Sequence, residues 1–293
     1  MSSVTGRIAE RAVISNLSIK SWRITRRDKR VKEAACAAYG SDADMVNGTK
    51  KLIAEERIKA VYTAEAKARE AHRAMTVPWG DKDRAISVDQ VPKCKSTLDK
   101  CLDIYDAAVK DFVTYYVDYI AEGQGKLNGL ADARDYPPAN EIAAHFTFSY
   151  GFEPLPVGRD DWRVKASDDV LAYLVAETEK AATERAANAL REPAERIREA
   201  VARMVESLSG YTGGRKGSFN DSMVDDIREL VDMLPALNLA GDARLAAIGD
   251  ELKSKLCTLD AEAYRGRDNT LIREVAIEDA QSILAGVDAF LAS

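Results

Sequence analysis

The chain has 293 residues, of which 46% are hydrophobic and 31% charged, and its formal net charge at pH 7 is −6. This length suits one large domain or two smaller ones with a sizeable core, and the composition excludes wholesale disorder, collagen and low-complexity sequence. No apolar run approaches the roughly 18–20 residues of a membrane helix, and charges interrupt the N-terminal stretch at Arg7, Glu10 and Arg11. We therefore expect a soluble, intracellular protein.

The N-terminal half predicts one strand and then helices. Residues 13–19 favour a strand, residues 50–75 are rich in Ala, Glu, Lys and Arg and predict a helix, and Pro78-Trp79-Gly80 predicts a turn. After this turn, apolar residues recur at steps of three and four, which predicts one long helix with an apolar stripe. The stripe consists of Leu98, Leu102, Tyr105, Val109, Phe112, Tyr116 and Ile120.

The middle of the chain carries the remaining strand signal. Residues 145–150 alternate around Phe146 and Phe148, which is typical of a strand. The segment Trp162-Arg163-Val164 is its predicted partner across a proline-bearing loop. These features predict a small β element near residues 145–165.

The C-terminal part predicts helices again. Ser167 is the predicted N-cap of a long helix, and Pro193 either kinks this helix or begins a new one in its first turn. The glycine-rich segment 210–217 predicts a flexible loop, and anion binding through its exposed amides is the alternative. Further apolar stripes cover residues 197–208, 223–234, 245–259 and 271–290.

These patterns together predict a mainly α protein. Steps that alternate between three and four suit long antiparallel helices in a bundle or coiled-coil arrangement. We expect three regions: an N-terminal helical region at 1–135 with a basic segment and a long hairpin, a small β and loop element at 136–166, and a C-terminal helical region at 167–293.

One segment is strongly basic, although the chain as a whole has a net negative charge. Between Lys20 and Lys32, seven basic residues stand against the single acidic Asp28, which makes the segment +6 and leaves −12 for the rest of the chain. A solvated helix face is the simpler explanation, and contact with nucleic acid or an acidic protein is the functional one. The candidate patch, with Trp22 available for stacking on bases, is Lys20, Trp22, Arg23, Arg26, Arg27, Lys29, Arg30 and Lys32.

A second candidate contact site lies where a basic helix end runs into the predicted turn. The helix macrodipole alone explains basic residues at a helix C-terminus. The functional alternative is a partner-binding site in which Trp79 is the anchor and Arg69, His72 and Arg73 bind an anion.

The sequence contains no recognisable catalytic or cofactor motif. The four cysteines, Cys36, Cys94, Cys101 and Cys257, form no C-x-x-C pair, and with two histidines no zinc-ligand spacing occurs. No nucleophile elbow or metalloprotease motif is present either. We therefore expect a non-enzymatic protein without a metal or cofactor, and reduced thiols.

Several motifs in a fixed order resemble an uncharacterised family of phage, prophage and plasmid proteins, catalogued as domain of unknown function 3150. The resemblance covers about residues 13 to 260, and its motifs are specific by order and spacing rather than singly. They are Leu17-x-Ile19-x-x-Trp22, Arg69-x-x-His72-x-x-x-Thr76-x-Pro78-Trp79, Tyr136-Pro137, Phe146-x-Phe148, Trp162-Arg163-Val164, Phe219-x-Asp221-Ser222-x-Val224-x-x-Ile227-Arg228-Glu229-Leu230 and Leu234-Pro235-x-Leu237-Asn238-Leu239-x-Gly241-Asp242. Trp162 stands where that family usually has Phe.

The resemblance implies a mobile-element origin and the cytoplasm of a bacterial host. Members of that family are often encoded near MoxR-type AAA+ ATPases, which implies an ATPase as partner. The leading hypothesis is therefore a helical adaptor or scaffold for a phage-encoded ATPase assembly, as an oligomer. The alternatives are a nucleic-acid-binding protein that uses residues 20–32, and an anti-defence protein that binds a host factor.

Overall fold

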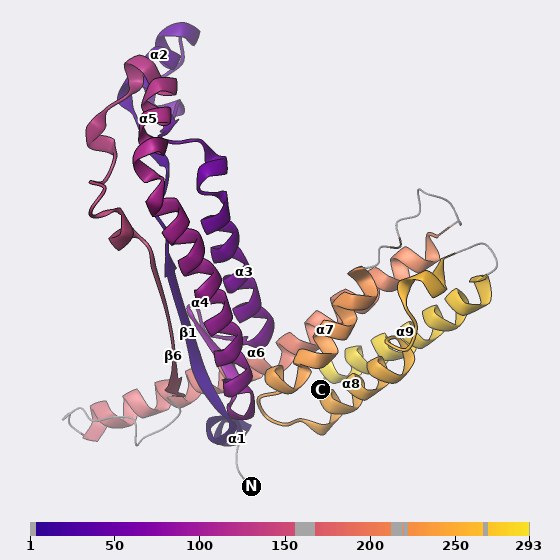
Figure 1. Cartoon of the computed structure of the whole chain (residues 1–293). Coiled ribbons are helices and arrows are strands. Elements are labelled where there is room, and N and C mark those ends of the chain that lie inside the picture. The colour runs from indigo at the N-terminus through magenta and orange to yellow at the C-terminus, as the bar shows by residue number, and fades with distance from the viewer. Residues whose placement is uncertain (1–3, 156–167, 212–218, 220–221, 266–268, 293) are drawn as a thin grey trace. The chain divides into compact units, whose positions relative to one another are not determined.

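The structure is a computed structural model and describes residues 4–155, 168–211, 219, 222–265 and 269–292. It is mainly helical with a small antiparallel sheet, as the sequence predicts in outline. No helix within these residues is long and apolar enough to cross a membrane. Figure 1 shows the elements along the chain.

The chain forms two compact units, and each is assembled from separate stretches of sequence. The first unit combines Met1–Asn16, Arg73–Cys94 and Gly151–Ser293, and the second combines Leu17–His72 and Lys95–Tyr150. The contiguous division at 1–135, 136–166 and 167–293 therefore differs from the units that the structure shows. The difference arises because β1 (Ala12–Lys20) and β6 (Thr147–Pro154) each run from one unit into the other.

The sheet has four strands in the order β4-β5-β1-β6. β4 (Val77–Trp79) and β5 (Asp83–Ser87) form a hairpin at the predicted turn, where Gly80 has a φ of 89° that favours glycine. β5 pairs antiparallel with β1 in a register that places Ile14 opposite Ala85. The sequence predicted β1 and β6 but not this hairpin, and the predicted partner strand 162–164 lies outside the described residues.

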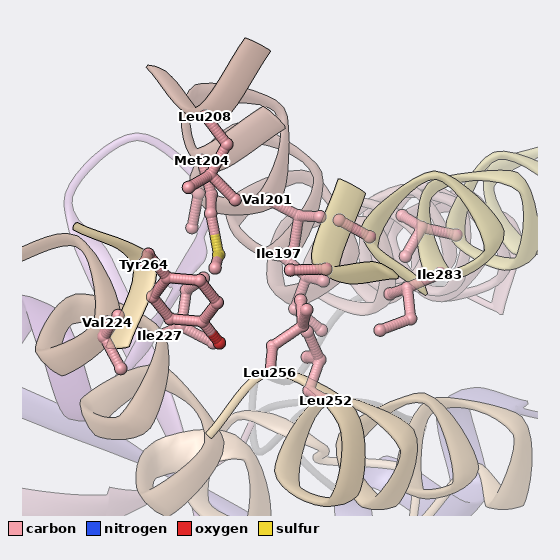
Figure 2. Packing of buried hydrophobic residues seen from close by; sticks show 14 of the residues in the cluster. Ile197, Val201, Met204, Leu208, Val224, Ile227, Leu252, Leu256, Tyr264 and Ile283 are labelled. Carbon is pink, nitrogen blue, oxygen red and sulfur yellow. The ribbon is translucent and has the colours of Figure 1, made fainter. Parts of the chain in front are cut away.

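The helices of the first unit enclose its larger core. Their apolar stripes meet in one cluster, in which Ile197 and Leu252 are at most 1% exposed; Figure 2 shows this packing. Burial of such side chains contributes roughly 1.5–3 kcal/mol each. These helices are α6 (Asp168–Ser209), α7 (Ser222–Leu237), α8 (Ala243–Lys255) and α9 (Thr270–Leu291). α1 (Val4–Arg11) instead buries Ile8 in a separate cluster around the sheet.

Pro193 does not end a helix. It lies inside the continuous α6, between Ala189 and Ala194, which are both fully buried. Packing on either side of the proline thus outweighs the lost backbone hydrogen bond. The predicted N-cap Ser167 and most of the glycine-rich segment, residues 212–217, lie outside the described residues.

The second unit packs its helices around an aromatic core. Trp22 lies 5.6 Å from Tyr116 and 6.1 Å from Phe112 between ring centroids, and Phe112 also meets Phe146 at 5.6 Å. The elements are β2 (Thr25–Arg27), α2 (Lys29–Tyr39), β3 (Thr49–Lys51), α3 (Lys59–Met75), α4 (Val91–Thr114) and α5 (Tyr116–Leu127), of which α3 and α4 extend into the first unit.

The long helix predicted over residues 98–120 is two helices. Leu98, Tyr105 and Phe112 are buried as the stripe predicts, but the helix is interrupted at Tyr115. The hydroxyl of Thr114 donates to the carbonyl of Lys110 at 2.8 Å, a bond that is typical of bent helices. The helix predicted at 50–75 is likewise shorter, because β3 and a 3-10 turn (Glu55–Arg57) precede α3.

Short 3-10 helices connect the longer elements. They lie at Ala43–Met45, Glu55–Arg57, Val88–Gln90, Asn128–Leu130, Ala133–Asp135, Ile142–His145 and Ala261–Tyr264.

Candidate functional site

The basic segment is divided among three elements of the second unit: Lys20 ends β1, Arg26 and Arg27 lie in β2, and residues 29–32 begin α2. β2 pairs antiparallel with β3, so that Arg26 lies opposite Lys50 and Arg27 opposite Thr49. The structure corrects the alternative that the whole segment is a helix face, because α2 begins only at Lys29. Successive residues of a strand point to opposite faces, and Arg26 and Arg27 are both exposed.

We call three neighbouring basic side chains, two in β2 and one at the first residue of α2, the basic ribbon: Arg26, Arg27 and Lys29. All three are exposed, and none forms an ion pair with any residue that the structure describes. Unpaired cations at a surface keep their full charge for a partner. By contrast, Arg23 and Arg30 of the same segment are engaged by Glu65 at 3.2 Å and by Asp28 at 2.8 Å.

Asp28 organises the start of α2 next to the basic ribbon. It is the N-cap of the helix and accepts a hydrogen bond from the backbone N–H of Arg30 at 2.9 Å. Its carboxylate also pairs with the Arg30 guanidinium at 2.8 Å and the Lys50 ammonium at 2.7 Å. These hydrogen bonds, that from Arg30 first, hold the pKa of Asp28 well below its ordinary value.

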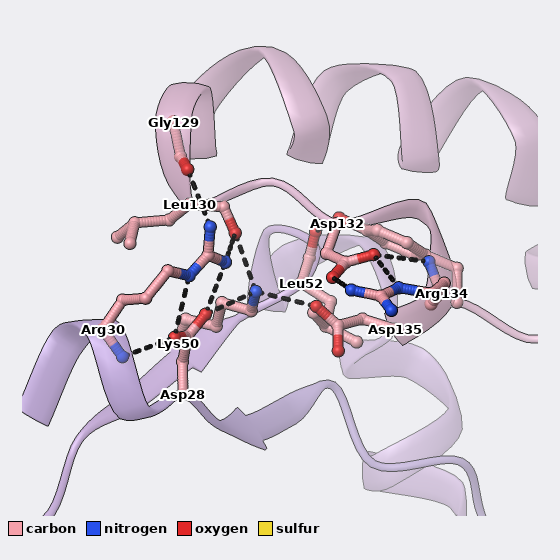
Figure 3. A network of polar contacts seen from close by, with 10 residues as sticks. Asp28, Arg30, Lys50, Leu52, Gly129, Leu130, Asp132, Arg134 and Asp135 are labelled. Atoms are coloured by element: carbon pink, nitrogen blue, oxygen red, sulfur yellow. Dashed lines mark hydrogen bonds and ion pairs between the residues drawn. The ribbon is translucent and has the colours of Figure 1, made fainter.

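Lys50 connects this helix start to the segment after α5 (Figure 3). Its side chain is 4% exposed, and its Nζ lies 2.7 Å from carboxylate oxygens of both Asp28 and Asp135 and donates to the Leu130 carbonyl at 2.7 Å. Burial alone would lower the pKa of Lys50, but hydrogen bonds to Asp135 and Asp28 outweigh it and raise the pKa. The ammonium therefore stays charged inside the network.

Further hydrogen bonds and ion pairs involve the segment after α5, residues 128–135. Arg30 donates to the carbonyls of Gly129 and Leu130 at 3.0 and 2.9 Å. Asp132 pairs with Arg134 at 2.8 Å, and this hydrogen bond lowers the pKa of Asp132 to about 2. Arg30 and Lys50 thus fasten the segment to the ribbon and to α2 by charge-assisted bonds, whereas the Asp132–Arg134 pair is internal to the segment.

α2 itself has no buried residue. It is held at its ends: Asp28 caps its start, and Gly40 closes its end with a φ of 63° and an N–H that donates to the Cys36 carbonyl. Tyr39, the last residue of α2, is 84% exposed, and Met45 in the 3-10 helix that follows is 85% exposed. A helix without core contacts that is capped at both ends presents its surface in a defined orientation.

The remaining residues of the predicted basic patch have different roles. Trp22 is 4% exposed and packs in the aromatic core, so it is not available for stacking on bases. Arg23 lies over the Tyr62 ring at 5.3 Å. Lys20 is exposed and, like the basic ribbon, forms no ion pair with a described residue, but it lies at the end of β1 rather than on β2. Lys32 is half-buried.

The second predicted contact site is not an exposed cluster. Trp79 is 1% exposed within the apolar cluster around the sheet, and His72 is 5% exposed, so Trp79 offers no accessible anchor. Arg69 is held within the second unit by Glu65 at 3.1 Å and by the Ile19 carbonyl. Arg73, which is exposed, belongs to the first unit.

Two features escape the sequence analysis. The first is the ion pair between Lys50 and Asp135, which are distant in sequence. Nothing in the Lys50-Lys51 doublet predicts that the first lysine is buried and the second exposed. The second feature is a pocket of about 460 Å³ in the first unit. It is lined by residues of both charges, among them Arg11, Asp89, Asp232, Asn238, Asp250 and Lys253.

No group of three potential metal ligands occurs within the described part of the chain. Comparisons of the chain with protein-family models, curated proteins and solved structures found no match.

Proposed function

We propose that this protein is a non-enzymatic binding protein that contacts duplex DNA through the basic ribbon. The observation that carries the proposal is the exposure of Arg26, Arg27 and Lys29 without an acidic partner among the described residues. Cationic side chains of this kind bind backbone phosphates, and this contact supplies most of the non-specific affinity for DNA.

The shape of the ribbon supports duplex DNA as the partner. The major groove of B-form DNA admits a two-stranded β-ribbon, whereas that of A-form RNA is too deep and narrow for side chains to read. Arg26 and Arg27 lie on opposite faces of β2. Because both side chains are exposed, a phosphate can be contacted from either face of the ribbon.

The polar network supports the proposal through preorganisation. Asp28, Lys50 and Asp135 hold the ribbon and the start of α2 together before any partner binds. A surface that is already ordered loses less conformational entropy on binding.

Charge reversal tests this proposal. We expect the double variant Arg26→Glu/Arg27→Glu to weaken binding to a 20-base-pair duplex at least about tenfold, and to reduce the slope of log affinity against log salt by roughly 1.5. Fluorescence anisotropy over a salt series measures both quantities. The matched control is Lys100→Glu/Lys110→Glu, which makes the same charge change at exposed positions of α4.

The control separates local from general electrostatics. If both double variants lose the same affinity for DNA, the loss is explained by the change in net charge and not by the basic ribbon. An unchanged affinity of the Arg26→Glu/Arg27→Glu variant would refute the proposal. Circular dichroism on each variant shows that the fold is intact.

A second proposal is the helical adaptor or scaffold, with its long helices as an antiparallel bundle. It is favoured by exposed apolar side chains on α4 and α5, where Ile104 and Val117 are 60% and 62% exposed. The family resemblance suggests a MoxR-type AAA+ ATPase in the bacterial cytoplasm as partner. Nuclease-treated pull-downs from phage-bearing cells should recover such an ATPase with the wild type but not with Ile104→Asp/Val117→Asp; a host protein as specific prey would favour the anti-defence alternative.

A further inference from the structure

The pocket of the first unit is lined by α7 and α8, by the end of α1 and by the segment after β5, all of which belong to this one unit. Its volume of about 460 Å³ lies within the roughly 300–1,000 Å³ of pockets that bind small molecules. Val231, Leu234 and Pro235 of α7 contribute apolar lining, and charged side chains contribute the rest of its character. The pocket shares no residue with the basic ribbon, so its size and lining point to a separate site for a small molecule.

Two glycines shape this pocket. A Cβ at Gly249 of α8 would lie 2.5 Å from the Cδ2 of Leu234, so the missing side chain lets α8 approach α7 closely. Gly241 lies in the turn between these helices, and a Cβ there would lie 3.1 Å from the Cζ of Arg11, whose guanidinium therefore rests against the turn. The side chain of Asn238 holds this turn through two hydrogen bonds, of 2.9 and 2.8 Å, to backbone groups four residues further on. The pocket and its arginine are thus in place before a ligand binds.

The charged residues that line the pocket are not neutralised by one another. None of the five forms an ion pair with a residue that the structure describes, and all are exposed: Arg11, Asp89, Asp232, Asp250 and Lys253. Asp250 and Lys253 are three residues apart on α8, a spacing at which opposite charges can pair. On the same helix but outside the pocket, Glu251 and Lys255 do pair, at 3.4 Å. The charges at the pocket are therefore left for a ligand.

The balance of these charges identifies the class of ligand. A purely cationic ligand would meet Arg11 and Lys253 with its own sign, and a purely anionic one would meet three carboxylates. A ligand with one carboxylate and two cationic groups offers an opposite charge to both kinds of side chain, and its net charge of +1 offsets the lining, in which three carboxylates stand against two cations.

We propose that the pocket binds a basic amino acid. The guanidinium of Arg11 accepts the role of carboxylate clamp, because it can donate two parallel hydrogen bonds to the two oxygens. The aspartates bind the two cationic groups, and the apolar side chains of α7 contact the methylene stem between them.

Calorimetric titration of the full chain with L-lysine and with L-arginine tests the proposal. We expect saturable binding of one molecule per chain. Cadaverine lacks the carboxylate of lysine, and ε-aminocaproate lacks its α-ammonium. Each should bind at least about tenfold more weakly than L-lysine, because each loses a charge-assisted contact. The absence of saturable binding for both amino acids would overturn the proposal.

Two substitutions assign the ends of the ligand. Arg11→Gln should weaken the binding of L-lysine at least about tenfold but should not weaken that of cadaverine, which has no carboxylate to lose. Asp250→Asn should weaken both ligands. The matched control Glu251→Gln removes an exposed carboxylate of the same helix that does not line the pocket, and should leave both affinities unchanged. Equal losses for the two ligands in Arg11→Gln, or equal losses in Asp250→Asn and Glu251→Gln, would contradict the proposed site.

Discussion

Replacing Lys50 by methionine is expected to lower the free energy of unfolding by about 3 kcal/mol. Methionine fills a similar volume but leaves the carboxylates of Asp28 and Asp135 without the ammonium that lies 2.7 Å from each. The cost is large because the side chain of Asp28 is only 8% exposed, so water cannot replace the lost partner. Urea unfolding monitored by the fluorescence of Trp22 and its neighbours measures the change.

The next residue is a matched control. Lys51 pairs with Glu55 at 2.6 Å, but both side chains are 60% exposed. Lys51→Met should therefore lower the free energy of unfolding far less than Lys50→Met does, because water screens and replaces the exposed pair. Similar losses in the two variants would show that burial does not distinguish these lysines.

Lys50→Met should also alter how the free energy of unfolding depends on pH. Since the folded pKa of Asp28 lies below its unfolded value, its stabilising contribution is complete above the ordinary pKa of an aspartate and is lost as the pH falls toward the folded value. Lys50→Met removes one of the hydrogen bonds that lower the pKa of Asp28. Acid therefore removes less stability from the variant than from the wild type. The difference in stability between wild type and variant should narrow below pH 4.

Replacing Gly123 by alanine is the second large expected effect, a loss of about 3 kcal/mol in the free energy of unfolding. A Cβ at this position of α5 would lie 2.0 Å from the carbonyl oxygen of Leu52 and 3.4 Å from the Cα of Ile53. Because these are backbone atoms, the contact is relieved only if α5 moves away from the segment after β3. Such a movement also strains the ties between Lys50 and residues 130–135.

Gly125 is the control within the same helix. A Cβ at Gly125 meets nothing within 4 Å, and the residue is exposed. Gly125→Ala should stabilise the protein by about 0.5–1 kcal/mol through the helix propensity of alanine. Opposite signs for the two substitutions in chemical unfolding would establish the close backbone approach, and equal signs would contradict it.

Periodicity predicted the larger elements because their physics is local. The stripes at 223–234 and 271–290 became α7 and α9, and alternation around Phe146 and Phe148 became β6. Each of these elements buries one face, so the spacing of apolar residues alone indicates it. The mainly α class with a small sheet follows from the same patterns.

Charge density was a weaker guide to the candidate site. It indicated the segment 20–32 but not which cations would be neutralised there. Arg23 and Arg30 are paired with Glu65 and Asp28, whereas the basic ribbon has no ion pair within the described ranges. That division depends on residues brought together by folding, and no spacing along the chain contains it.

The sequence likewise did not show whether a tryptophan would be buried in a core or exposed at a contact surface. Trp22 and Trp79, both predicted at contact surfaces, are buried in two different cores. A tryptophan gains free energy equally by filling a core and by contacting a partner, so its type does not distinguish these uses.

The sequence by itself therefore determined the helical class, most helix positions and the place of the excess positive charge, because these depend on side-chain spacing and composition. Only the tertiary structure decided that β1 and β6 run through both units and that Lys50 lies buried between two carboxylates. It also decided that Arg26, Arg27 and Lys29 form no ion pair with any residue in the described part of the chain. The physical reason is that burial and ion pairing are set by contacts between residues far apart in the chain, whose energies exceed local preferences.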